Sequence, residues 1–135
     1  MNSKSREVKL SILSEMISMA TIDNDLKERE YNFLLAVAKQ LDVSKLDLDR
    51  LFSAPAPFKP QKSESERIIQ FYRLVLMMNI DEDKDPREEK LVKECGLRMG
   101  LNPIAMDKVL VIMEQYEDHI VPTSVLLDIF KTHYN

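Results

Sequence analysis

Two short acidic stretches are the part of this sequence best suited to chemistry. Each contributes two aspartates and one glutamate, namely Asp23, Asp25 and Glu30 in the first and Asp81, Asp83 and Glu88 in the second. Carboxylate oxygens are the ligands that hard cations such as Ca²⁺ and Mg²⁺ prefer. The two stretches are therefore candidate metal sites, and a divalent cation is the one cofactor that the sequence suggests.

The second acidic stretch begins like the loop of a calcium-binding EF-hand. Pro86 stands where that loop needs Gly, however, and Val92 stands where it needs a bidentate Glu, so a standard EF-hand is excluded. Helix capping explains the same residues. Asp85 as N-cap, Pro86 as first helical residue and Glu88 as third would form a capping box at the positive end of a helix dipole.

The first acidic stretch is harder to explain by capping. Lys27 occupies the position before the helix, so Asp23 and Asp25 have no predicted capping role. A cation held by these two aspartates and Glu30 would have few protein ligands. We expect weak affinity unless water or another segment completes the coordination shell.

Other reactive side chains give weaker signals. Cys95 lies alone in a helical pattern and is expected to be a small buried hydrophobe. His119 and His133 have no Cys or His at zinc-ligand spacing. The eight methionines lie mostly on apolar helix faces and are expected to fill the core; the alternative is a metal-thioether or tellurium-related site. Since no catalytic triad or phosphate-binding loop is evident, we expect a protein that is not an enzyme.

The acidic stretches belong to an internal repeat with a spacing of 58 residues. Residues 13–52 align without a gap on residues 71–110, so that Asp23 matches Asp81 and Arg29 matches Arg87. Apolar character is kept at pairs such as Leu13 and Phe71. One supersecondary unit has therefore been used twice, and with only two copies we expect a closed domain, not a solenoid.

Hydrophobic periodicity and capping residues place every expected element in a helix. We expect an all-α fold, a compact bundle of about seven helices built from two tandem three-helix repeats plus a C-terminal helix. Repeat one covers about 4–52, a proline-rich linker covers 53–62, repeat two covers about 63–115 and the last helix covers about 122–132, all within a single domain, 1–135. The first three expected helices span about 4–21, about 27–41, and the residues after Ser44 to about Phe52. The next three begin at Ser63, at Pro86, with an end at about Met99, and at Asn102-Pro103. The last expected helix spans Pro122 to about Lys131.

The segment from Ala20 to Glu30, ATIDNDLKERE, resembles the signature of the TerB-like tellurite-resistance family. In that signature an Asp, usually followed by Gly, precedes a branched apolar residue and a helix with Glu in its first turn. The segment from Asp81 to Glu88 resembles it more weakly. Asn24 and Glu82 replace the Gly, and Asn tolerates the left-handed backbone better than Glu does.

The resemblance covers nearly the whole chain. It implies a domain of about seven helices, a suspected metal site in the acidic turns, and a non-enzymatic binding or scaffolding module connected with tellurite or another stress. Family members also occur beside other domains, including co-chaperone J-domains. The alternative function is a divalent-cation sensor that uses the acidic turns between helices.

The composition of the chain indicates its class of protein, its expected location and the partners it could bind. With 44% hydrophobic and 31% charged residues and a net charge of −4, the chain has the composition of a soluble globular protein. Its Lys and Arg are scattered, so nucleic acid is not an expected partner. No apolar run suits a membrane span and the N-terminus is polar, so we expect a cytoplasmic protein.

The helix around Ile68–Met78 is apolar on nearly all sides and must be covered by its own domain or by a second subunit, as in a homodimer. Other protein partners cannot be named from the sequence.

Overall fold

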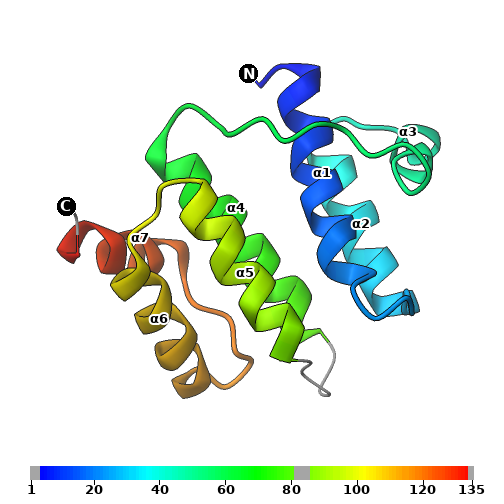
Figure 1. Ribbon diagram of the computed structural model, residues 1–135. Coiled ribbons are helices and arrows are strands. Elements are labelled where there is room, and N and C mark those ends of the chain that lie inside the picture. Colours follow the sequence, from blue (N-terminus) through cyan, green and yellow to red (C-terminus); the bar gives the residue numbers. More distant parts are fainter. Residues whose placement is uncertain (1–3, 81–85, 134–135) are drawn as a thin grey trace. The chain divides into compact units, whose positions relative to one another are not determined.

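The computed structural model describes residues 4–80 and 86–133, and within these the chain is all-helical with no strand (Figure 1). The described elements are α1 (Arg6–Ala20), α2 (Glu28–Gln40), α3 (Lys45–Arg50), α4 (Glu64–Asn79), α5 (Pro86–Arg98), α6 (Pro103–Ile112), the 3-10 helix η1 (Met113–Gln115) and α7 (Thr123–Thr132). The prediction of an all-α fold with about seven helices is confirmed. None of the helices in this part of the chain is long and apolar enough to cross a membrane.

The chain divides into two compact units, Met1–Pro60 and Gln61–Asn135. The boundary falls inside the proline-rich segment 53–62 that the sequence marks as a linker. The expectation of a single domain stays a prediction.

In the first unit, α1 packs against α2 and α2 packs against α3. Leu13, Met16, Leu34 and Leu48 are completely buried and form much of its apolar core. The proline-rich segment lies along α1 because two helix serines hold its backbone. The hydroxyl of Ser14 accepts a hydrogen bond from Ala56 N at 2.9 Å, and that of Ser11 accepts one from Lys59 N at 2.8 Å.

In the second unit, α4 packs against α5 and α7, and α6 packs against α5 and α7. α4 and α5 lie side by side in Figure 1. The ring of Phe71 on α4 meets that of Phe130 on α7 edge to face, with 6.0 Å between centroids. Both rings are buried, as are Leu74 and Val75, so the apolar helix predicted around Ile68–Met78 is a core helix of this unit.

The helix boundaries reproduce the internal repeat. α1, α2 and α3 begin at Arg6, Glu28 and Lys45, and α4, α5 and α6 begin 58 residues later at Glu64, Pro86 and Pro103. The bonds that end the second helix of each unit recur as well. Val43 N donates to Ala38 O and Leu101 N donates to Gly96 O, around residues of positive φ at Asp42 (59°) and Gly100 (81°).

The predicted helix starts are confirmed by their capping bonds. Ser44 Oγ accepts from Asp47 N at 3.1 Å, and Ser63 Oγ accepts from Glu66 N at 3.1 Å. Asn102 Oδ1 accepts from Ile104 N at 2.8 Å, with Pro103 in the first turn. The side chain of Asp47 is turned to Arg6, whose Nη2 donates to its carboxylate at 2.8 Å.

Candidate functional site

The first acidic turn connects α1 to α2 and is held by bonds within itself. Asn24 has a φ of 61°, the left-handed conformation that the sequence led us to expect Asn to tolerate. Asp23 Oδ1 accepts a hydrogen bond from Asp25 N at 3.1 Å, and Asn24 N donates to Thr21 O at 2.9 Å. Asp23 therefore has a structural role as the acceptor of an Asx-turn, which was not predicted from the sequence.

Glu30 is the most confined carboxylate of this turn. Its side chain is 4% exposed, and its Oε1 accepts a hydrogen bond from Lys27 N at 3.1 Å. Lys27 is the N-cap of α2 and Glu30 its third residue, so this bond supplies the glutamate half of a capping box. Burial raises the pKa of Glu30, the bond from Lys27 N opposes that rise, and the negative charges of Asp23 and Asp25 add to it.

The three predicted ligands of the first turn thus lie near enough for their charges to interact. Asp23 and Asp25 are exposed, whereas Glu30 is buried and bonded to the backbone. Across residues 4–80 and 86–133, no group of three or more His, Cys, Asp or Glu side chains could hold a metal ion. A cation at Asp23, Asp25 and Glu30 would need water or residues outside these ranges to complete its coordination.

The second acidic turn is described only from Pro86 onward. Asp81 and Asp83, two of the predicted ligands, lie outside the described residues, as does Asp85, the predicted N-cap. Pro86 is the first residue of α5, as predicted. Glu88 is the third, and it is 5% exposed. Glu30 and Glu88 are therefore buried glutamates at matching positions of the two repeats, a relationship that the alignment alone could have indicated.

Of the other side chains considered from the sequence, Cys95 is buried and His119 is exposed. Cys95 is 5% exposed, and Arg98 Nη2 lies 3.9 Å from its Sγ. His119 Nδ1 lies 3.7 Å from the carboxylate of Glu114 on the surface of the second unit. These positions agree with a buried cysteine and a surface histidine.

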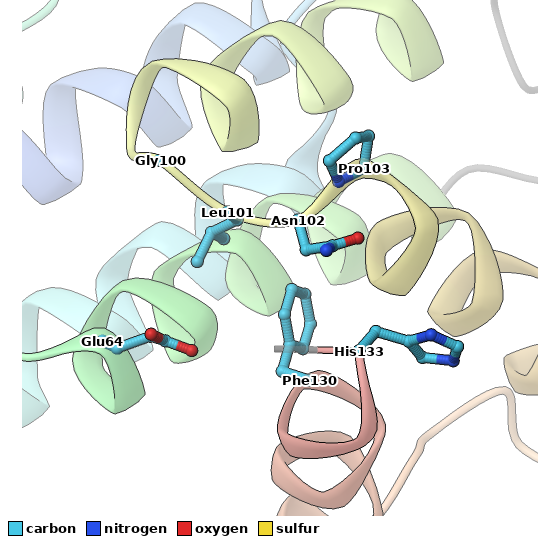
Figure 2. Close-up of a pocket in the computed structure, with 7 residues that line it drawn as sticks. All are labelled: Glu64, Gly100, Leu101, Asn102, Pro103, Phe130 and His133. Carbon is cyan, nitrogen blue, oxygen red and sulfur yellow. The ribbon is translucent and has the colours of Figure 1, made fainter. Parts of the chain in front are cut away.

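His133 lines a cavity of about 240 Å³ in the second unit. Figure 2 shows Glu64, from the start of α4, on one side of this cavity and Phe130 and His133, from the end of α7, on another. The loop between α5 and α6 supplies Gly100, Leu101 and Asn102. Asn102 Oδ1 is used in capping α6, so its amide nitrogen is the group that could donate to a ligand.

The cavity at Glu64 and His133 was not predicted from the sequence. Its residues come from three separated segments, and only the packing of α4, α6 and α7 brings them together. The one local signal was Asn102, which the sequence identified as a helix cap and not as a cavity residue.

A second cavity, of about 290 Å³, lies in the first unit between α1 and the proline-rich segment. Leu10, Ala56, Pro57 and Phe58 give it an apolar lining, and Glu7 and Lys59 stand at the same cavity as an ion pair. The bond from Lys59 Nζ lowers the pKa of the Glu7 carboxyl and so favours its charged form.

Comparisons of the chain with protein-family models, with curated proteins and with solved structures found no match. The resemblance to the TerB-like family therefore depends on the residues of the acidic turns and stays a prediction.

Proposed function

We propose that this chain is a non-enzymatic binding or scaffolding module of the TerB-like kind, with a role in the response to tellurite or another stress. The observation that carries the binding role is the apolar cavity beside the proline-rich segment. Its volume, about 290 Å³, is that of a small ligand pocket and would accept an apolar side chain of a protein partner.

The cavity wall is fixed before any partner arrives. Pro55, Pro57 and Pro60 restrict the backbone of the segment, and the hydroxyls of Ser11 and Ser14 anchor it to α1. A preformed wall reduces the entropy that binding must overcome. The charged pair of Glu7 and Lys59 at the cavity would orient a polar or charged neighbour of the inserted side chain.

A comparison of variants in the native host tests this role. Tagged protein is crosslinked in cells and purified, and the captured proteins are compared between the unchanged chain and Phe58→Ser. The matched control is Ile120→Asp, a change at an exposed apolar residue of the other unit. We expect Phe58→Ser to lose at least one protein that the control retains. Identical sets from both variants, with helicity unchanged by circular dichroism, would contradict the proposed binding site.

The alternative function is a divalent-cation sensor centred on Asp23, Asp25 and Glu30. The observation that favours it is the effect of Asp23 and Asp25 on the pKa of Glu30, since a cation would relieve the repulsion among these carboxylates. A cation that binds only the folded state should raise the melting temperature as its concentration increases above the dissociation constant. Asp23→Asn should remove the response to Ca²⁺ and Mg²⁺. A melting temperature that millimolar Ca²⁺ and Mg²⁺ leave unchanged would eliminate the sensor.

A further inference from the structure

Helix α6 exposes a narrow stripe of four residues, one of which, Asp107, also pairs with Lys93 of the same unit. Ile104, Asp107, Lys108 and Val111 are all exposed, and their spacing of three, four and seven residues places them on one helix face. Ile104 is 63% exposed and Val111 is 66% exposed. The opposite face, with Ala105, Met106 and Val109, is buried.

Read in the opposite direction, the stripe keeps its apolar ends and exchanges the signs of its two central charges. An apolar residue stands at each end, and two residues of opposite charge stand in the middle. If two such helices lie antiparallel, Ile104 of each meets Val111 of the other, and Asp107 of each meets Lys108 of the other. A surface with this property is complementary to itself, which is what an interface around a twofold axis requires.

From this self-complementary pattern we propose that the stripe binds a second copy of this chain, with the two α6 helices antiparallel. The apolar ends supply buried area, and the two crossed pairs of Asp107 and Lys108 fix the antiparallel register. A parallel arrangement of the same two stripes would place like charges against each other.

Neighbouring residues of α5 extend this surface. Lys93 Nζ lies 3.0 Å from Asp107 Oδ1, so α5 runs beside the stripe. Leu97 stands one turn after Lys93 on the same face of α5 and is 54% exposed. It adds apolar area next to the stripe, at the end where α5 approaches the start of α6.

Helix α3, the counterpart of α6 in the first unit, is less suited to the same contact. Leu46 occupies the position of Ile104 and is 61% exposed, but Ser53 occupies the position of Val111. Asp49 accepts hydrogen bonds from both Lys45 and Tyr31 and is 39% exposed, whereas Asp107 pairs with Lys93 and is 61% exposed. The proposed interface therefore belongs to α6.

An interface of two short helices and a flanking leucine is small, and small interfaces give weak complexes. Sedimentation velocity of the full chain from about 10 µM to 1 mM should show a monomer at the low end and a growing share of dimer at the high end. A sedimentation coefficient that stays that of the monomer throughout would overturn the proposal.

Charge variants test the antiparallel register. Lys108→Asp places carboxylates opposite each other twice in the dimer, so we expect the dissociation constant to rise at least tenfold, or about 1.4 kcal/mol. The double exchange Asp107→Lys with Lys108→Asp restores both crossed pairs. It is made together with Lys93→Gln, so that the lysine introduced at position 107 does not face Lys93. The dissociation constant should return to within a few-fold of that of Lys93→Gln alone. Failure of the double exchange to recover association would contradict this register.

Apolar variants test whether α6 itself forms the contact. Ile104→Asp should leave the chain monomeric at 1 mM, and Leu46→Asp, its matched control at the equivalent position of the first unit, should associate like the unchanged chain. Equal effects of the two variants would overturn the proposal. These changes lie outside the cavity lined by Phe58, so the dimer and the proposed binding role can fail independently.

Discussion

Gly96 on α5 and Met106 on α6 are packed so closely that a methyl group on the glycine would overlap the methionine. A Cβ atom built on Gly96 would lie 2.1 Å from Met106 Sδ and 3.2 Å from Phe71 Cδ1. Phe71 and Met106 are both buried. The absent side chain of Gly96 thus allows three helices, α4, α5 and α6, to approach one another.

Gly96→Ala should therefore destabilise the fold although it replaces glycine inside a helix. The helical preference of Ala favours the change by about 1 kcal/mol, but overpacking a filled core costs typically about 1–3 kcal/mol. Because Met106 is 1% exposed and has little room to move, we expect an overpacking cost in the upper part of this range, about 2–3 kcal/mol, and a net loss of about 1–2 kcal/mol. Urea denaturation followed by circular dichroism measures the free energy of unfolding.

The first repeat supplies a matched rescue for this variant. Ala38 and Leu48 stand at the positions of Gly96 and Met106, and both are buried. Combining Gly96→Ala with Met106→Leu copies this pair into the second unit and should recover at least half of the lost stability. A single variant as stable as the unchanged chain would show that Met106 yields without cost and would contradict the packing argument.

Helix starts were predictable from sequence because their causes are local. Ser44, Ser63 and Asn102 cap helices through bonds to residues two or three positions away, so short patterns identify them. The cavity lined by Glu64 and His133 was not predictable, since its residues meet only through packing within the second unit. The Asx-turn at Asp23 is a local feature that was not predicted, because Asp23 was interpreted as a metal ligand.

Ser11 and Ser14 show a further limit of sequence reasoning. Both side chains lie on the buried side of α1, where Ser11 is 2% exposed and Ser14 is 7% exposed. The hydrophobic pattern of α1 gives no reason for a serine at either position. Their purpose depends on a segment more than forty residues away, because their hydroxyls bind the backbone of the proline-rich linker. The periodicity of α1 alone could not indicate that contact.

Replacing Ser14 by Ala should loosen the proline-rich segment. The amide of Ala56 would lose its acceptor, and a hydrogen bond of this kind contributes about 0.5–1.5 kcal/mol. We expect the amide of Ala56 to exchange with deuterium several-fold faster, as measured by NMR. Ser18→Ala is the control on the same helix, because Ser18 Oγ donates its hydrogen bond to Ser14 O and not to the proline-rich segment. Equal protection of Ala56 in both variants would contradict the anchoring role.

The hydroxyl of Tyr72 on α4 accepts a hydrogen bond from Val121 N, just before α7. Val121 is 1% exposed, so water cannot easily replace this acceptor. Tyr72→Phe should therefore lower the free energy of unfolding by about 1–3 kcal/mol, the cost of an unsatisfied buried amide. Chemical denaturation measures the loss, and a change below about 0.5 kcal/mol would show that the bond does not fix the segment before α7.

Because the pKa of Glu30 is raised, replacing its carboxylate by a neutral side chain should stabilise the folded chain by an amount that depends on pH. A carboxyl whose pKa in the folded state is above its usual value of 4.5 holds its proton more tightly when folded. Stability is therefore lost as pH rises from 4.5 through the raised folded pKa, and the whole cost is present above it. Glu30→Gln keeps an oxygen acceptor for Lys27 N and removes the charge near Asp23 and Asp25.

We expect Glu30→Gln to raise the melting temperature at pH 7 and to have little effect at pH 4, where the carboxyl of the unchanged chain is largely protonated. Glu28→Gln, at an exposed position of the same helical turn, is the matched control. If the first acidic turn binds a divalent cation, the advantage of Glu30→Gln at pH 7 should shrink or reverse as Ca²⁺ reaches millimolar concentration, because only the charged carboxylate attracts the ion. An advantage that Ca²⁺ and Mg²⁺ leave unchanged would indicate that Glu30 acts only as the capping residue of α2.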